Sequence, residues 1–329
     1  NWRVWALAAA LALCLLLALA VGSVSIAPGE VAARCFDALR GRARGDALDR
    51  IILDARLPRV LLAAAVGSAL ALAGLAAQNL FRNPLAGPHV IGVSSGAALG
   101  AVAAMLFAGA AGWAVAFWSM AGGLAVGAAV FFLARTGRQW GYSLLLAGIA
   151  LGTLCSALTT GALYIAGERL QTIIFWLMGG FWRANWSEAR VMLPLAVAAA
   201  VALRLMAPAM NVAVLGERSA EDTGVNVRRL QFGLLAVAVV PTSVAVSLAG
   251  VIGFVGLIAP HMVRLVIGND HRALVPGCAF AGALLLAGAD AVARTAAAPA
   301  EIPVGLITAI LGAPLFLWLL LRRAGEGRR

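Results

Sequence analysis

About ten long apolar runs constrain this chain more than any other feature. Each is close to the roughly 20 residues that an α-helix needs to cross a membrane, and together they fill most of the 329 residues. Hydrophobic residues make up 63% of the chain and charged residues 12%, so it is far more apolar than a soluble domain. We therefore expect an all-α membrane protein with about ten transmembrane helices. The expected spans are 4–24, 57–81, 90–108, 114–133, 144–166, 191–206, 230–248, 251–267, 273–292 and 302–321.

The charged residues are mostly arginines between these runs. The net charge of +11 arises because 25 basic residues, all of them arginine, outnumber 14 acidic ones. Such arginines suit lipid headgroups and acidic protein partners. No interleaving of aromatic and basic residues indicates a nucleic-acid groove, so no nucleic-acid partner is expected. Ten spans would place both termini on one side, and the arginine distribution favours the cytoplasm for that side by a small margin.

Motifs for catalysis, metal binding or ATP binding do not stand out. The four cysteines form no CxxC pair and the three histidines have no ligand spacing, so neither a disulfide framework nor a metal site is expected. His261 follows Pro260 inside a span and is interpreted as a packing histidine. A Walker-type glycine loop is absent, so ATP is expected to bind elsewhere. The chain itself is expected to hold no cofactor.

The expected spans are nearly free of charge. Asp290 lies four residues before Arg294, which predicts an ion pair on one helix face. A proton-coupled secondary carrier would need charged groups within the membrane, and an enzyme embedded there would need clustered acids, bases or nucleophiles. Neither pattern is present, although the secondary carrier stays as the alternative from another class. The energy for transport is therefore expected to come from another subunit.

Three segments between the spans are more polar. The stretch 25–56 carries six arginines and is expected to be a loop. The stretch 168–190 contains three tryptophans and is expected to be a short interfacial helix, because indole rings favour the headgroup level. The third, 211–229, reads NVAVLGERSAEDTGVNVRR, and its apolar spacing predicts short helical turns. It is either a solvated connector or a knob that contacts a partner.

A series of short motifs then resembles a known family over nearly the whole chain. The motifs, in order, are RLPR (56–59), RNPLA (82–86), GVSSGA (92–97), LLAG (145–148), WLMGG (176–180), LGE (215–217), GFVGLIAPH (253–261), AD followed by R (289–294), EIPVG (301–305) and GAP (312–314). They resemble the permease subunit of the binding-protein-dependent ABC importers for iron-siderophores, haem and cobalamin, the FecCD-type family.

This resemblance implies a type II ABC importer permease fold in a single transmembrane domain, 1–329. It implies a cytoplasmic coupling element at about 208–229 and a periplasmic loop at about 25–56. Two copies of the permease would enclose one path in the bacterial inner membrane, with both termini cytoplasmic. Two ATPase subunits would bind ATP and magnesium and hydrolyse the ATP, and a periplasmic binding protein would deliver the substrate. The permease would be a transport subunit and not an enzyme.

The resemblance also implies roles for individual residues. The ATPase-coupling residues would be Leu215, Gly216, Glu217, Ala220 and Gly224. The arginines that meet acidic residues of the binding protein would be Arg56, Arg59 and Arg294. The cytoplasmic gate would comprise Asn83 and Leu85, with Gly141, Tyr142 and Ser143 on the loop before the fifth span. The fifth span and the segment after it would line the path.

The family pattern is less informative about the substrate. General resemblance favours haem, with ferric siderophore and cobalamin as alternatives, and no single residue identifies the ligand. His89 and Tyr142 depart from the family pattern, because relatives often have a smaller or more apolar residue near these positions.

Overall fold

The protein is a bundle of helices throughout the part of the chain that the structure describes. This structure is a computed structural model, and it describes residues 2–22, 24–108, 112–135 and 140–326. No β-strand occurs among these residues. The elements are α1 (Trp2–Ala20), α2 (Pro28–Leu39), α3 (Ala47–Asp49), η1 (Arg50–Arg56), α4 (Leu57–Leu80), η2 (Pro88–Ile91), α5 (Val93–Phe107), α6 (Gly112–Arg135), α7 (Trp140–Tyr164), η3 (Gly167–Arg169), α8 (Leu170–Leu177), α9 (Trp186–Ala213), α10 (Glu217–Asp222), α11 (Val227–Ala249), α12 (Val255–Ile267), α13 (His271–Thr295) and α14 (Val304–Glu326).

The long apolar helices agree with the expected spans. Within the described ranges, seven helices are long and apolar enough to cross a membrane, and three shorter apolar helices accompany them. The shorter ones are Val93–Phe107, Val255–Ile267 and Val304–Leu317. Each of the ten overlaps one of the ten predicted runs, so the prediction of an all-α membrane protein is confirmed.

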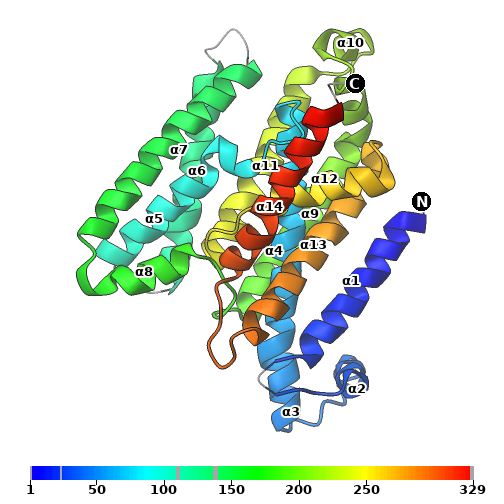
Figure 1. The fold of residues 1–329 in the computed structure, drawn as a ribbon, viewed down its shortest axis with the longest axis vertical. Coiled ribbons are helices and arrows are strands. Elements are labelled where there is room, and N and C mark those ends of the chain that lie inside the picture. The colour runs from blue at the N-terminus through cyan, green and yellow to red at the C-terminus, as the bar shows by residue number, and fades with distance from the viewer. Residues whose placement is uncertain (1, 23, 109–111, 136–139, 327–329) are drawn as a thin grey trace.

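Helix α4 forms the centre of the bundle (Figure 1). In the most apolar stretch of the helix that ends in α4, 89% is buried. Helices α9, α11, α12 and α13 pack around it. Close packing depends on glycines that let two backbones meet. A Cβ atom on Gly74 would lie only 1.7 Å from the carbonyl oxygen of Gly256, and one on Gly67 would lie 2.2 Å from that of Gly282. No larger residue fits at either crossing unless the helices move apart.

Helices α5, α6, α7 and α8 form a second group beside this core (Figure 1). In α6 and in α7, only 28% of the most apolar stretch is buried. Leu146, Leu154 and Leu158 on α7 are about half exposed, at 49%, 54% and 52%. Such outward apolar faces suit contact with lipid or with another protein subunit.

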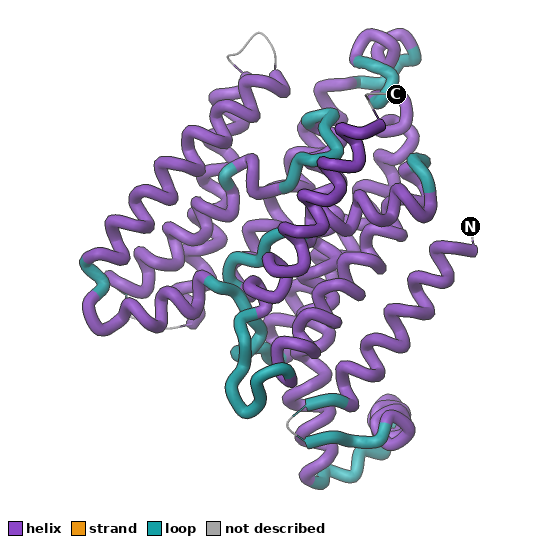
Figure 2. The backbone as a smooth tube through the Cα atoms, viewed as in Figure 1, coloured by secondary structure: helices purple, strands orange, loops and turns teal. Residues whose placement is uncertain are grey.

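The loops gather at the two ends of the bundle (Figure 2). We name these ends after the short helices they carry. The α10 end also contains the beginning of α1 and the end of α14, and the opposite α2 end contains α2, α3 and the loop between α13 and α14 (Figure 1). With an even number of spans, the first helix begins at the same end of the bundle at which the last helix ends.

The structure corrects the expectation that 25–56 is only a loop. This segment forms α2 and α3, and the π-helical turn η1 then runs directly into α4. The resulting apolar helix extends from Ala47 to Leu80, over 34 residues. Asp46 starts it, because its side chain accepts a hydrogen bond of 2.9 Å from the backbone N–H of Asp49.

The expected interfacial helix at 168–190 is also shorter than predicted. A 3₁₀ turn and α8 form its first part, and the chain then leaves the helix at Gly179, whose φ of +71° favours glycine. Asn185 caps the next helix, α9, which is longer at both ends than the predicted span of 191–206. At its far end the helix continues past the predicted span through Asn211 to Ala213, towards α10.

Candidate functional site

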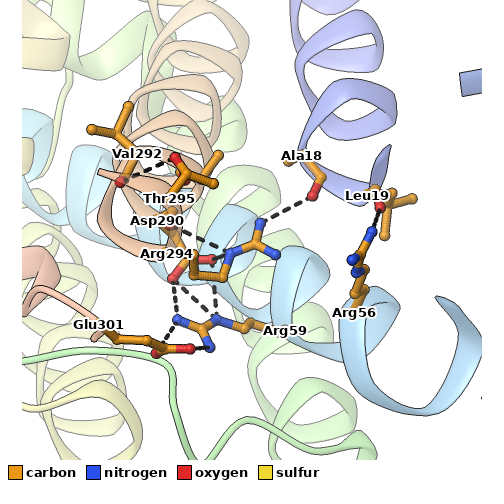
Figure 3. A network of polar contacts seen from close by, with 10 residues as sticks. Ala18, Leu19, Arg56, Arg59, Asp290, Val292, Arg294, Thr295 and Glu301 are labelled. Atoms are coloured by element: carbon orange, nitrogen blue, oxygen red, sulfur yellow. Dashed lines mark hydrogen bonds and ion pairs between the residues drawn. The ribbon is translucent and has the colours of Figure 1, made fainter. Parts of the chain in front are cut away.

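Arg59 belongs to an ionic network at the α2 end (Figure 3). Its guanidinium group lies 3.0 Å from Asp290 and 2.9 Å from Glu301, and Arg294 lies 3.1 Å from the second oxygen of Asp290. The Asp290 side chain is 1% exposed. The predicted ion pair between Asp290 and Arg294 is confirmed. Because two arginines face two carboxylates, the charges of the network sum to zero.

Arg56 and Arg294 cap the end of α1. Arg56 Nη1 donates hydrogen bonds to the carbonyl oxygens of Leu19 at 2.8 Å and Ala20 at 3.2 Å. Arg294 Nη2 donates to the carbonyl oxygen of Ala18 at 3.0 Å (Figure 3). The last carbonyls of a helix have no partner within the helix, and they carry partial negative charge. The arginines therefore attach α1 to α4 and α13.

Arg56, Arg59 and Arg294 are the three residues predicted to meet acidic residues of the binding protein. Arg56 is 6% exposed and Arg294 9%, and the Arg59 side chain is 13% exposed. Each guanidinium group is bound by atoms of this chain, because burial of an unpaired charge is costly. Their role in docking a binding protein stays a prediction, and in this structure they join helices.

Sequence reasoning missed a second ionic cluster, centred on Arg34. This arginine is 6% exposed and contacts Asp49 at 2.8 Å, Asp46 at 2.5 Å and Glu30 at 3.2 Å. The cluster ties α2 to the start of the long helix that continues into α4. Only the spacing of Glu30 and Arg34, four residues apart on a helix, could have indicated part of it.

The Arg34 cluster changes the acidity of its members. Hydrogen bonds from Arg34 lower the pKa of Asp46, and the backbone N–H of Asp49 lowers it further. The same bonds raise the pKa of Arg34, because they stabilise its charged form. Arg34 and Asp46 therefore stabilise each other's charged form.

Other arginines at the α2 end are exposed, and we call them the exposed arginine group. Its members are Arg40, Arg42, Arg44 and Arg50. Arg40 stacks on Phe36 at 4.0 Å from the ring centre, and Arg44 lies 3.6 Å from the partly exposed Asp37. These side chains, and not the three predicted arginines, offer accessible positive charge at this end.

The predicted gate residues Asn83 and Leu85 lie in the loop after α4. The Asn83 side chain accepts a hydrogen bond of 3.0 Å from the backbone N–H of Leu85, which forms a tight turn. Arg82, directly before them, has a φ of +49°. That conformation is uncommon for a residue with a side chain, so the loop leaves α4 through a strained position.

The other three gate residues lie elsewhere than predicted. Gly141, Tyr142 and Ser143 form the first turn of α7 and not a loop, because α7 begins at Trp140. A Cβ atom on Gly141 would lie 3.9 Å from the carbonyl oxygen of Leu80. The structure thus brings the start of α7 beside the end of α4, and Tyr142 is 60% exposed there. Their role as a gate stays a prediction.

Helix α7, the predicted path-lining span, has few free polar groups. Thr159 Oγ1 donates to the carbonyl oxygen of Cys155 at 2.8 Å, and Thr160 Oγ1 donates to that of Ser156 at 3.0 Å. The hydroxyl of Ser156 donates to Ser95 at 3.3 Å. Because these hydroxyls bond within the chain, this helix would hold a passing ligand only weakly.

The predicted coupling segment forms α10, which projects from the α10 end (Figure 1). Leu215 is 75% exposed just before it, and Gly216 has a φ of +123°. Gly224, with a φ of +82°, ends the turn after it. Ala220, within α10, is 0% exposed, and its contact with a partner stays a prediction. The side chain of Glu217 lies outside the described part of the structure.

A polar cavity of about 560 Å³ opens at the α10 end. It lies where the end of α4 meets the end of α9 and the start of α13, and sequence reasoning missed it. On its wall, Arg264 donates a hydrogen bond of 2.6 Å to the side chain of Gln78, which in turn donates to the carbonyl oxygen of Leu257 at 3.3 Å. Within the described residues, no group of three or more His, Cys, Asp or Glu could hold a metal ion.

The fold defines a class of protein. Ten apolar helices around glycine-rich crossings, with polar elements confined to the two ends, are typical of a polytopic membrane transport subunit. Residues 10–322 match the model of the FecCD transport family. The chain belongs to this family and is the permease subunit of an ABC importer.

Two curated relatives cover nearly the whole chain. One is the hemin transport system permease protein HmuU of Yersinia pestis, 43% identical over 317 residues and 94% of each chain. Another is the vitamin B12 import system permease protein BtuC of Citrobacter koseri, 41% identical over 314 residues, 94% of this chain and 91% of the relative.

Two solved structures resemble the fold. An inward-facing metal-chelate type ABC transporter has a TM-score of 0.86 and 32% identity, covering 97% of this chain and 99% of the other. PsaBC from Streptococcus pneumoniae, bound to a Fab, has a TM-score of 0.53 and 14% identity, covering 79% of this chain and 88% of the other. The second likeness concerns the fold alone.

Proposed function

We propose that this chain is the permease subunit of an ATP-driven importer that moves haem across the bacterial inner membrane. The observation that carries this proposal is the 43% identity to a hemin permease over 94% of both chains. Cobalamin is the second candidate, because a vitamin B12 permease is 41% identical over a similar length. A ferric siderophore is a further alternative within the same family.

In this proposal two copies of the chain enclose the path. The α10 end faces the cytoplasm and contacts two ATPase subunits through α10, and the α2 end receives a periplasmic binding protein. Both termini are then cytoplasmic. The arrangement is supported by the exposed polar helix α10 at the end towards which α1 begins and α14 ends (Figure 1).

The character of α7 suits a large apolar ligand. Its exposed leucines provide an apolar face, and the hydroxyls of Thr159 and Thr160 bond to carbonyl oxygens of their own helix. A path that bound haem tightly would retain it, so weak and nonspecific contacts favour passage. This property also suits other bulky ligands and explains why the permease carries little information about its substrate.

Reconstitution tests the proposal. The chain is placed in proteoliposomes with its ATPase and binding protein, and uptake of haem, cobalamin and a ferric siderophore is measured with and without ATP. We expect haem uptake that requires both ATP and the ATPase. Faster uptake of cobalamin or siderophore would reassign the substrate. Uptake without the ATPase that collapses with the proton gradient would instead identify a secondary carrier.

A further inference from the structure

A chain of hydrogen bonds connects the segment before α10 to the end of α4. Asn211 lies in the last turn of α9. Its side-chain oxygen accepts from the backbone N–H of His271 at 2.9 Å and lies 2.7 Å from Nδ1 of the same ring. Its side-chain nitrogen donates to Asp270 at 2.7 Å. The other ring nitrogen, His271 Nε2, lies 3.1 Å from the side-chain nitrogen of Asn79, in the last turn of α4.

These contacts determine the direction of each hydrogen bond. The Asn211 oxygen can only accept, so His271 Nδ1 donates to it. The Asn79 nitrogen can only donate, so His271 Nε2 accepts from it. The histidine therefore joins two amides from different helices. Because His271 is only 3% exposed, water does not readily replace either partner.

This chain of hydrogen bonds lies between the two functional segments proposed at the α10 end. Asn211 lies just before Leu215 and α10, which we propose to contact the ATPase. Asn79 lies just before the strained Arg82 and the proposed gate residue Asn83. His271 therefore stands between the coupling segment and the gate, on a third helix.

The surroundings allow this chain of hydrogen bonds to rearrange. Asn79, Asn211 and His271 all line the cavity of about 560 Å³, as do the charged side chains of Arg82, Arg264 and Asp270. A close-packed core resists such changes. Here, the hydrogen bonds border a cavity, and one of them ends on the charged Asp270. The side chains on the cavity wall therefore have room to move together.

We infer that His271, with Asn211 and Asn79, is a positioning group that transmits displacement of the α9–α10 segment to the gate end of α4. Transmission between sites requires a contiguous physical connection that both sites can bias, and this chain of hydrogen bonds provides one. The inference rests on the proposed function, because it assigns a connection between two elements of that mechanism.

The test compares ATP use with transport in the reconstituted complex. His271→Ala and Asn211→Ala each interrupt the chain, and uptake per ATP hydrolysed is measured for each. We expect this quotient to fall at least about fivefold, the low end for coupling between two sites, while hydrolysis continues. His271→Gln keeps one donor and one acceptor and should restore part of the quotient. The double variant should lose little more than either single variant.

Asn269→Ala is the matched control. Asn269 is an exposed asparagine on the same cavity wall, two residues from His271, and the change should leave the quotient unaltered. Assembly with the ATPase is checked by co-purification. If His271→Ala does not assemble, the partly buried Asn211→Ala decides the matter.

Two outcomes would overturn the inference. One is an unchanged quotient in assembled Asn211→Ala and His271→Ala complexes. The other is an equal loss of hydrolysis and uptake without rescue by His271→Gln, which indicates a structural role only. Failure of the proposed function looks different, because the unmodified chain would then show no ATP-dependent uptake.

Discussion

The two ends of the bundle are held by different kinds of polar contact. At the α2 end, buried carboxylates pair with arginines, as Asp290 does with Arg59 and Arg294 at 3.0 and 3.1 Å. At the α10 end, neutral amides and one imidazole bond beside a cavity of about 560 Å³. Breaking a buried ion pair costs about 3–5 kcal/mol, whereas a neutral hydrogen bond contributes about 0.5–1.5 kcal/mol net. The α2 end is therefore a rigid frame and the α10 end is the adaptable one.

The largest expected effect tests the rigidity of the α2 end. Asp290→Asn removes a charge that two arginines share, and it leaves two buried cations with only Glu301 nearby. We expect a loss of about 3–5 kcal/mol in the free energy of unfolding, as for other broken buried pairs, measured by chemical unfolding in detergent. Glu301→Gln is the control, because Glu301 is 36% exposed and exposed pairs contribute about 0–1 kcal/mol. Equal losses would contradict the contrast between the two ends.

A smaller effect concerns how an acidic binding protein approaches the α2 end. The network of Arg59 has no net charge, whereas the exposed arginine group projects a local positive field. Arg42→Glu should therefore slow association about severalfold at low salt, and added salt should reduce the difference. Arg59→Gln should leave the association rate nearly unchanged.

Stopped-flow association at two ionic strengths measures both variants. The docking role of Arg56, Arg59 and Arg294 implied by family resemblance predicts the opposite ranking. If Arg59→Gln slows association while Arg42→Glu does not, the ionic network opens when the partner binds, and the α2 end is less rigid than the structure indicates.

The smallest expected effect depends on pH. Arg34 lowers the pKa of Asp46 in the folded protein, so folding favours the ionised carboxylate. The resulting stabilisation is present above the ordinary aspartate pKa of about 4 and is lost as pH falls through the lowered value. Hydrogen exchange of the segment between α2 and α3 should therefore increase only in acid. Asp46→Asn should reduce this pH dependence, because Asp49 still faces Arg34, and an unchanged profile would contradict the ionic description of the cluster.

Local patterns in the sequence predicted much of the fold. Apolar runs of membrane length predicted the seven long and three shorter apolar helices of the described residues, and the spacing of Asp290 and Arg294 predicted an ion pair that the structure contains. These features depend on residues that are near each other in the chain. The same reasoning failed at helix ends, where Asp46 and Asn185 start helices in stretches that composition alone described as polar.

The candidate sites were harder to predict because their partners are far apart in the chain. Arg59 meets Asp290 and Glu301 at separations of 231 and 242 residues, and Asn79 meets His271 at 192. The family resemblance assigned Arg59 to contact with the binding protein, and nothing in the sequence connected Asn79 with a histidine. Only the packing of α4 against α13 brings both pairs together.

The apolar runs were enough to predict a membrane bundle, since such runs can satisfy their backbone in lipid only as helices. The chain's motifs also determined the family. Which charged side chains are exposed could be seen only in the folded protein, because burial and pairing depend on which helices meet. In the fold, the three arginines predicted to dock the binding protein are buried, and the exposed arginine group is accessible. A histidine lies between the proposed coupling segment and the proposed gate.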